Sequence, residues 1–260
     1  MKKHLYTSIV QLTNNPIYTM ALKRFATSKL SGLLTNSFSK TFKIDEQEME
    51  GTSSDYPSLH DFFVRNLKEG SRPLHEEVDS IVSPVDGKLS QLGVIDSENF
   101  FHVKEKDYSL ATMLGLTNTT KRYEGGTYML FYLSPRDYHR IHSPIKGHVV
   151  KRWAIGKYSE PVNQWGLLFG NSPLANNYRL ITELEYNNKR MAVVKIGALN
   201  VNSVQTTHLN SSVERGEEIA YFTFGSSVIL LFEKDMVTPS FDMNHENVPI
   251  KQGEKIASLN

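Results

Sequence analysis

YRLITELEYNNKRMAVVKI, residues 178–196, places two apolar-rich runs on either side of Asn187-Asn188. The runs, 178–186 and 190–196, have the alternating or continuous apolar pattern of β-strands. Asn tolerates the positive φ angles of tight hairpin turns. The stretch therefore predicts an antiparallel hairpin.

Similar runs separated by turn residues occupy the rest of the chain from Ile81 onward. They lie at 88–94, 128–133, 148–155, 218–222 and 228–232. We expect brief helical interruptions near 108–114 and 134–140, and Ser58 followed by Asp61 predicts the start of another short helix. The fold class is therefore α+β, with a mostly antiparallel, barrel- or sandwich-like core at 76–260 and a helical region at 1–75.

Composition excludes several classes of protein. The chain has 39% hydrophobic and 22% charged residues and a mean hydropathy of −0.37, which argues against disorder and polytopic membrane insertion. It has no cysteine, which excludes disulfides, iron–sulfur clusters and thiol nucleophiles. Polar residues interrupt the segment after Met1-Lys2-Lys3-His4, so we expect no signal peptide and a protein that stays inside the cell.

The amino-terminal region, residues 1–44, forms a basic and amphipathic arm. Residues 1–44 hold seven Lys and Arg and no acid, which leaves 22 basic against 28 acidic residues and a net charge of −6 for the rest. Apolar residues recur there at helical spacing: Tyr18, Leu22, Phe25, Ala26, Leu30, Leu33, Leu34 and Phe38. The stripe either packs on the core or docks on an anionic surface, and no apolar run approaches the about 20 residues that span a bilayer.

The first of three motifs that bear on chemistry is Ser83-Pro84-Val85-Asp86-Gly87, a turn that enters a strand. Asp86 is its only ionisable group. Taken alone, Asp86 is explained by a hydrogen bond to its own turn backbone.

The second motif is the run 134–144, SPRDYHRIHSP, with His139 and His142 three residues apart after an apolar strand. Imidazoles there serve as acid–base groups, as metal ligands or as packed, hydrogen-bonded residues. No HExxH or comparable ligand pattern accompanies them, so we expect no metal site.

The third motif, Phe224-Gly225-Ser226-Ser227-Val228, precedes a strongly apolar strand. Alone it reads as a glycine-kinked edge or turn, and it lacks the G-x-S-x-G of a nucleophile elbow. With the other two motifs it supplies an acid, an imidazole and a hydroxyl, the parts that activate a serine nucleophile. The nearest electrophile is the unhindered Gly225 carbonyl.

These motifs resemble the phosphatidylserine decarboxylase family, closest to its shorter bacterial branch, over nearly the whole chain. The matching segments are 82–87, 132–144, 194–198 and 216–228, in the family's order. The resemblance implies that Asp86, His142 and Ser226 form a self-cleavage triad that cuts between Gly225 and Ser226. Residues 1–225 would form the β fragment and 226–260 the α fragment.

The resemblance further implies a carboxy-lyase whose cofactor is a covalent pyruvoyl group made from Ser226. Its ketone would form an imine with the amine of phosphatidylserine, releasing CO2 and phosphatidylethanolamine. His139 would be the proton donor or acceptor in that step, with Tyr132, Tyr138 and Phe224 as pocket walls. A homodimer is implied by the resemblance alone, because the sequence does not reveal the oligomeric state. We expect peripheral binding to the anionic surface on the cytoplasmic side of the cell membrane, and no nucleic-acid partner.

Two positions depart from the family pattern, and two rival functions stay open. Ser227 stands where the family usually has Thr, and Tyr178 where it more often has Glu. The rivals are a non-catalytic lipid- or partner-binding module that has lost processing, and a decarboxylase of a related serine lipid.

Overall fold

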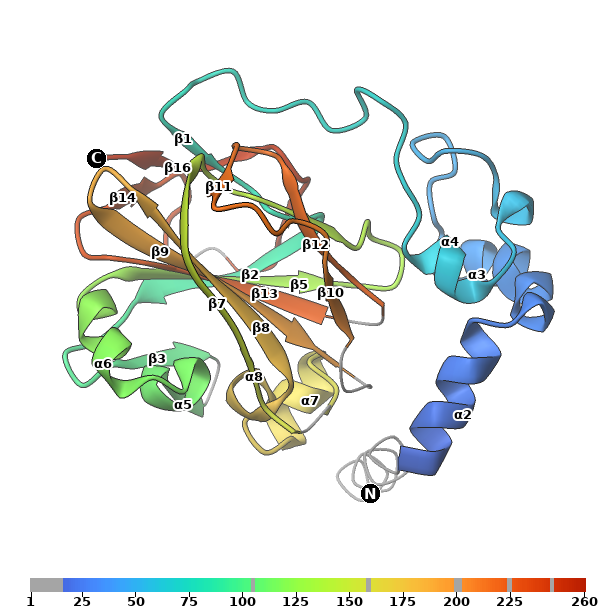
Figure 1. Ribbon diagram of the computed structural model, residues 1–260, viewed down its shortest axis with the longest axis horizontal. Coiled ribbons are helices and arrows are strands. Elements are labelled where there is room, and N and C mark those ends of the chain that lie inside the picture. Colours follow the sequence, from blue (N-terminus) through green and yellow to red (C-terminus); the bar gives the residue numbers. More distant parts are fainter. Residues whose placement is uncertain (1–15, 104–105, 158–159, 199–202, 224–225, 244–245) are drawn as a thin grey trace.

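The structure is a computed structural model that describes residues 16–103, 106–157, 160–198, 203–223, 226–243 and 246–260. Its centre is an antiparallel sheet of eight strands in the order β11-β7-β8-β9-β13-β5-β2-β15 (Figure 1). In chain order these strands are β2 (Gly87–Val94), β5 (Thr127–Leu133), β7 (Gly147–Ile155), β8 (Arg179–Tyr186), β9 (Lys189–Gly197), β11 (Ser212–Val213), β13 (Ser226–Phe232) and β15 (Val248–Ile250). All seven strands expected from the sequence are confirmed.

The hairpin that was predicted from residues 178–196 joins β8 to β9. Tyr186 pairs with Lys189 across the turn, and Asn187 and Asn188 have φ angles of 49° and 62°. Both angles lie in the left-handed region that Asn tolerates better than most residues.

Two three-stranded sheets pack on one face of the large sheet. One has the order β1-β16-β14 and the other β10-β12-β6. Their strands are β1 (Ser80–Val82), β6 (Arg140–His142), β10 (Val204–Thr206), β12 (Glu218–Phe222), β14 (Val237–Pro239) and β16 (Lys255–Leu259). A core that includes Ile81, Ile141 and Phe222 from the small sheets and Val228 and Leu230 from β13 fills the space between the layers.

The opposite face of the large sheet is covered by a hairpin and short helices. These are β3 (Phe100–Val103), β4 (Lys106–Ser109), α5 (Leu110–Leu114), α6 (Thr117–Thr120), η3 (Lys121–Tyr123), α7 (Gln164–Phe169) and α8 (Pro173–Asn176). A second core lies beneath them. The α+β, mostly antiparallel expectation is confirmed, whereas a barrel is wrong for the described strands, because the large sheet ends at β11 and β15 without closing.

The helix expected near 134–140 is wrong. Ser134 donates from both its N–H and its hydroxyl to the Asp137 carboxylate, each at 2.7 Å, and accepts from the Asp137 N–H at 2.9 Å. These bonds close a tight turn that competes with helix formation, and β6 follows directly. The interruption near 108–114 is confirmed in part: β4 runs to Ser109, and α5 begins at Leu110.

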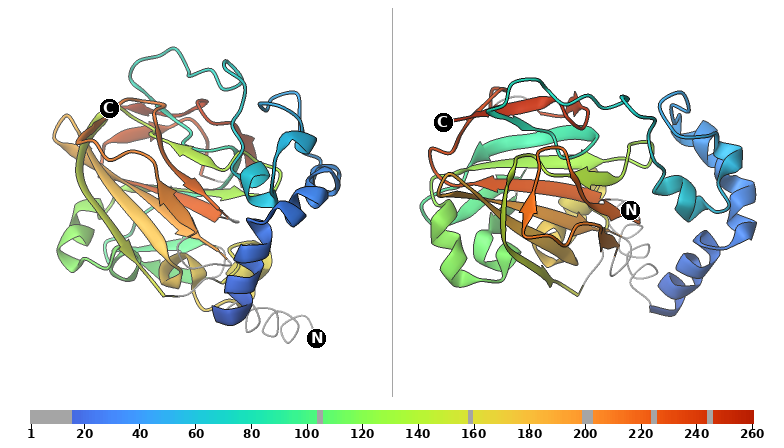
Figure 2. Two further views of the ribbon diagram at one scale, coloured as in Figure 1. Left: turned by 45° about the vertical axis from the view of Figure 1, so that its right-hand side comes forward. Right: turned by 45° about the horizontal axis from the view of Figure 1, so that its top comes forward.

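Helical segments precede the first strand and lie to one side of the sheets (Figures 1 and 2). They are α2 (Pro16–Ala26), η1 (Lys29–Leu34), α3 (Thr35–Phe42), η2 (Ser53–Asp55) and α4 (Leu59–Phe63). The predicted Ser58 cap of α4 is confirmed, since its hydroxyl accepts from the Asp61 N–H at 3.1 Å. None of the helices among the described residues is long and apolar enough to cross a bilayer.

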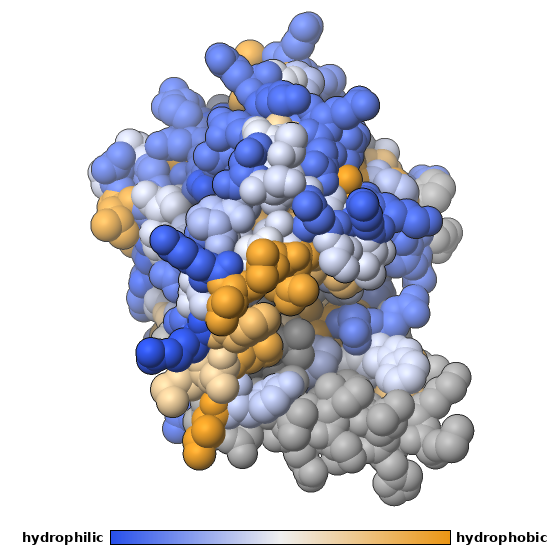
Figure 3. Space-filling model, turned by 90° about the vertical axis from the view of Figure 1, so that its right-hand side faces the viewer, coloured by the Kyte–Doolittle hydropathy of each residue, from blue (hydrophilic) through white to orange (hydrophobic). Residues whose placement is uncertain are grey.

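Most of the apolar stripe of the arm faces outward. Leu30 and Leu33 are 70% and 82% exposed, and the exposed fractions of Tyr18, Leu22, Phe25 and Leu34 are between 39% and 43%. Figure 3 shows an apolar patch on the side of the molecule that carries the helical segments. Phe38 of the arm packs against a small cluster of Ile44, Met49 and Phe62. The sheets therefore leave the larger part of this stripe uncovered.

Candidate active site

Ser226 begins β13 near the middle of the large sheet. Its Cα pairs with Leu133 of β5 on one side and with Gly197 of β9 on the other. The residue is fully buried, and in the part of the chain that the structure describes its hydroxyl has no hydrogen-bond partner. Buried hydroxyls are normally paired, because an unpaired one loses its hydration without compensation. Phe224 and Gly225, predicted as pocket wall and cleavage residue, lie outside the described residues.

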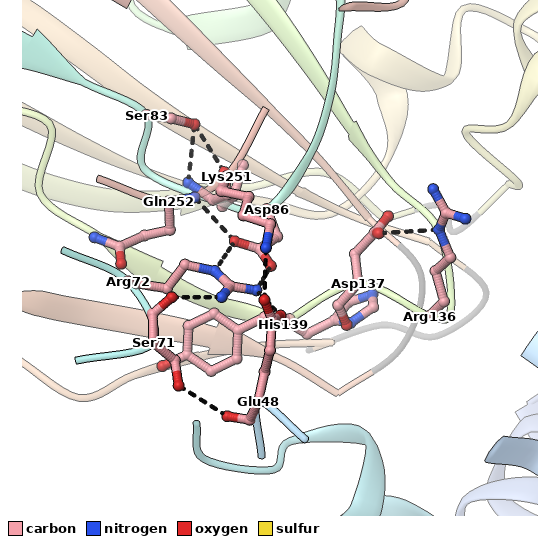
Figure 4. Close-up of polar contacts among 12 residues, drawn as sticks. Glu48, Ser71, Arg72, Ser83, Asp86, Arg136, Asp137, His139, Lys251 and Gln252 are labelled. Atoms are coloured by element: carbon pink, nitrogen blue, oxygen red, sulfur yellow. Dashed lines mark hydrogen bonds and ion pairs between the residues drawn. The ribbon is translucent and has the colours of Figure 1, made fainter. Parts of the chain in front are cut away.

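Asp86 is held by side chains and backbone from distant segments. Its carboxylate accepts two bonds from Arg72, Nε to Oδ1 at 2.8 Å and Nη2 to Oδ2 at 2.5 Å, and a third from the Gln252 N–H at 2.9 Å (Figure 4). Among the described residues, the Asp86 carboxylate makes no hydrogen bond with the backbone of its own turn. Next to it, Gly87 has a φ of 143°, and a Cβ there would lie 2.3 Å from the Tyr132 carbonyl oxygen.

Arg72 is a site residue that the sequence reasoning missed. It also donates to the Glu48 carboxylate at 2.8 Å, so it links Asp86 to the amino-terminal region. Burial by itself lowers the pKa of Arg72, but the hydrogen bonds that Arg72 donates to Asp86 and Glu48 raise the pKa overall. An Arg fourteen positions upstream of Asp86 gives no local spacing signal, because only the folded chain brings the two together.

His142 lies at the end of β6 with both ring nitrogens engaged. Nδ1 donates to the Gly216 carbonyl at 2.8 Å, and because a carbonyl only accepts, Nε2 accepts from the Tyr138 hydroxyl at 3.2 Å. Burial lowers the pKa of His142, while the Gly216 bond, the charge of Glu218 and, more weakly, the charge of Asp86 oppose that shift. Among the described hydrogen bonds none joins His142 to Asp86 or to Ser226, so the structure orients this ring through Gly216 and Tyr138.

His139 is fully buried and has a free basic nitrogen. Nδ1 donates to the Asp137 carbonyl at 2.8 Å, whereas Nε2 finds no hydrogen-bond partner among the residues that the structure describes. Its ring packs on Phe63 with centroids 3.9 Å apart, and its carbonyl accepts from the Phe222 N–H at 2.9 Å. Burial, with a smaller contribution from Arg65, lowers the pKa of His139 to about 3. At neutral pH this ring is an uncharged base.

Arg65 is a second residue that the sequence reasoning missed. It follows α4, and its Nη2 donates to the carbonyls of Arg136 and Asp137 at 2.7 and 3.1 Å. Its Nε and Nη1 are buried, with no hydrogen-bond partner within the described ranges, and burial lowers the pKa of Arg65. The helical region thus fixes the loop that carries His139.

A cavity of about 530 Å³ opens beside this cluster. Its wall includes Gly87, Tyr132, Ser134, Arg136 and Ser227, together with Asn163, Gln164, Trp165 and Leu167 around α7. Tyr132 therefore lines this cavity. Tyr138 instead lines a neighbouring polar cavity with Arg72 and Asp86.

Comparison with known proteins gives consistent results. Residues 59–258 match the family model described as phosphatidylserine decarboxylase. A Bacillus mycoides (strain KBAB4) protein named phosphatidylserine decarboxylase proenzyme is 46% identical over 258 residues, covering 99% of this chain and 98% of the relative. Proteins of the same name from Bacillus thuringiensis (strain Al Hakam) and Bacillus cereus (strain 03BB102) are 45% identical with the same coverage. The chain belongs to the phosphatidylserine decarboxylase family.

Proposed function

We propose that this chain is a phosphatidylserine decarboxylase that converts phosphatidylserine into phosphatidylethanolamine and CO2 after cutting itself between Gly225 and Ser226. The observation that carries this proposal is the buried, unpartnered Ser226 hydroxyl at the start of β13. A hydroxyl kept away from water and free of hydrogen bonds is available as a nucleophile. The relatives' shared name, proenzyme, supports a maturation step of this kind.

In the proposed cleavage, Ser226 Oγ attacks the Gly225 carbonyl carbon. His142 takes the hydroxyl proton and returns it to the departing Ser226 nitrogen, so that an ester replaces the amide. Loss of the Ser226 α-proton then breaks the Cβ–Oγ bond and leaves Gly225 as a carboxylate. Residue 226 is then a dehydroalanine with a free amino group. Water replaces its nitrogen, which leaves as ammonia, and a pyruvoyl group results.

For this role His142 must exchange its bond with the Tyr138 hydroxyl for one with Ser226. Nδ1 is held by the Gly216 carbonyl, which fixes the tautomer that leaves Nε2 as the base. Asp86 favours the protonated ring through its charge. Arg72 and the Gln252 N–H hold that carboxylate in place.

The burial of Ser226 at the start of β13 suits a covalent pyruvoyl group. When formed, this group supplies a carbonyl that captures the substrate amine and withdraws the electron pair of the breaking Cα–carboxylate bond. Residue 226 would carry it covalently, and the free Nε2 of His139 would hold and deliver a proton. A buried base of lowered pKa suits delivery of a proton once it has been loaded.

We place the lipid headgroup in the cavity beside Ser227. Its wall holds two carboxylates, Asp137 and Glu246, and two cationic side chains, Lys88 and Arg136, which can bind a phosphodiester. A cation on the substrate carboxylate would stabilise the ground state against decarboxylation, so these two side chains are better used on the phosphate.

The helical arm is proposed as the site of peripheral docking to an anionic membrane surface. Leu30 and Leu33 are exposed on it, with exposed Lys23, Arg24 and Lys29 nearby in sequence. Apolar burial and attraction of basic side chains to anionic lipid reinforce each other. This docking would bring the decarboxylase to its substrate at the cytoplasmic side of the membrane.

Intact mass spectrometry of the purified protein tests the proposal. We expect two fragments divided after Gly225, the second with a pyruvoyl-blocked amino terminus, and an uncut chain for Ser226→Ala. One intact wild-type chain under all conditions would instead favour a non-catalytic lipid-binding module. Turnover of a panel of serine-headgroup lipids decides between phosphatidylserine and a related substrate.

A further inference from the structure

A second buried serine lies directly beside Ser226. Gly197 is the cross-strand partner of Ser226, and a Cβ added to Gly197 would lie 1.9 Å from Ser203 Oγ and 3.2 Å from Ser203 Cβ. The Ser203 hydroxyl therefore occupies the space that a side chain at position 197 would take.

The Ser203 and Ser226 hydroxyls share one face of the large sheet. Side chains directly opposite each other on neighbouring strands point to the same face, with Cβ atoms about 5 Å apart. On β13, Val228, Leu230 and Phe232 lie two, four and six residues after Ser226, so their side chains point to the same face as Ser226. They enter the core between the layers. On β9, Met191 and Val193 have the same parity as Gly197 and enter the same core.

Both hydroxyls are buried and unpaired. Ser203 and Ser226 are each fully buried, and neither Oγ has a hydrogen-bond partner among the described residues. Because Ser203 Oγ lies where a Cβ of Gly197 would be, and cross-strand Cβ atoms are about 5 Å apart, a rotation about χ1 can bring the two hydroxyls within hydrogen-bonding reach, where each can donate and accept.

The backbone of Ser203 is tied to the segment that leads to the cleavage point. Its carbonyl accepts from the Thr223 N–H at 2.8 Å and from the Thr223 hydroxyl at 3.3 Å. The next residue, Val204, pairs with Phe222. Ser203 is thus tied to Thr223 on one side, and through Gly197 it lies next to the strand position of Ser226 on the other.

We propose that Ser203 is a positioning residue for self-cleavage, whose hydroxyl hydrogen-bonds Ser226 Oγ and holds it for attack on the Gly225 carbonyl. This inference rests on the proposed function. Its consequence is specific in time, because Ser226 Oγ leaves with Gly225 as a carboxylate oxygen. Ser203 therefore acts in maturation and has no such partner during decarboxylation.

The test is the half-time of cleavage of full-length chain made by cell-free translation, followed by intact mass. Because misplacing a reacting group costs about tenfold to a hundredfold in rate, we expect Ser203→Ala to lengthen the half-time by that factor. Turnover of phosphatidylserine per pyruvoyl group should stay within about twofold of wild type, since transition-state contacts are unchanged. A purely structural role would lower thermal stability without this split.

Ser80→Ala is the matched control. Ser80 is another buried serine, but it lies in β1, in a different sheet from Ser226, and its hydroxyl donates to the Glu77 carbonyl. The Ser80→Ala chain should cut itself at the wild-type rate. If Ser203→Ala does not accumulate as folded protein, Ser203→Cys replaces it, with slow cleavage again expected. A wild-type half-time in the folded variant overturns the Ser203 role and leaves the proposed function intact, whereas failure of the wild-type chain to cut overturns both.

Discussion

Arg72 and Asp86 form a two-pronged ion pair that is almost closed to solvent, with the guanidinium and carboxylate side chains 8% and 9% exposed. The pair joins the segment before the first strand to the turn that enters β2. Glu48 and the Gln252 N–H complete the network. A buried network of this kind is favourable only while all its members are paired.

Arg72→Gln should therefore destabilise the fold strongly. Removing one partner of a buried pair leaves an uncompensated charge and costs about 3–5 kcal/mol of unfolding free energy. Urea unfolding in a Ser226→Ala background, where we expect one uncut polypeptide, measures the loss. The control is Arg122→Gln, which breaks an exposed pair with Glu233 and should cost less than about 1 kcal/mol. Equal losses from the two substitutions would contradict the assignment.

His142 and His139 should separate cleavage from decarboxylation. His142→Ala removes the proposed base and should slow self-cleavage by about a hundredfold or more. His139→Ala should still cut, but the cut enzyme should lose decarboxylation by a similar factor. The measurements are cleavage half-time and CO2 release per pyruvoyl group. Equal loss of self-cleavage in the two variants would refute this division of roles.

His139 should make stability depend on pH below its ordinary pKa. Its pKa falls from 6.5 in the unfolded chain to about 3 in the folded one, so the unfolded chain takes up the proton first. The contribution of the neutral His139 ring to the free energy of unfolding is therefore fully present above pH 6.5. It is lost as the pH falls from 6.5 toward 3, by about 1.4 kcal/mol per pH unit.

His139→Asn removes this slope, and unfolding of the Ser226→Ala chain between pH 6.5 and 4 measures it. His148→Asn, at an exposed position in β7, serves as the control and should keep the parental slope. Identical slopes in His139→Asn and its parent would show that this imidazole is not held neutral by burial.

The exposed apolar face of the arm should control binding to membranes. The double substitution of Leu30 and Leu33, each by Asp, should weaken sedimentation with anionic vesicles by at least about tenfold. The reason is that burying two leucines in the membrane contributes more than about 1.4 kcal/mol to the free energy of binding. Leu209→Asp alters a leucine on the sheet domain that is 80% exposed and should leave binding unchanged. Equal sedimentation of the arm variant and wild type would remove the docking proposal.

Local pattern carried much of the fold. Period-two runs located the main strands, because alternation of side chains across a sheet is a property of neighbouring residues. It failed at 134–140, where the Asp137 side chain closes a turn, and it missed short strands such as β1 and β6, which have only three residues each. Strands of that length depend on their partners for stability.

The sequence by itself determined the kinds of element, the antiparallel hairpin and the three motifs that bear Asp86, the histidines and Ser226. Only the tertiary structure decided that Arg72 holds Asp86, that Gly216 and Tyr138 orient His142, and that Ser203 lies beside Ser226. The reason is physical. Periodicity and turn chemistry act between near neighbours in the chain, whereas the pairing of buried polar groups depends on which distant segments are brought together when the layers pack.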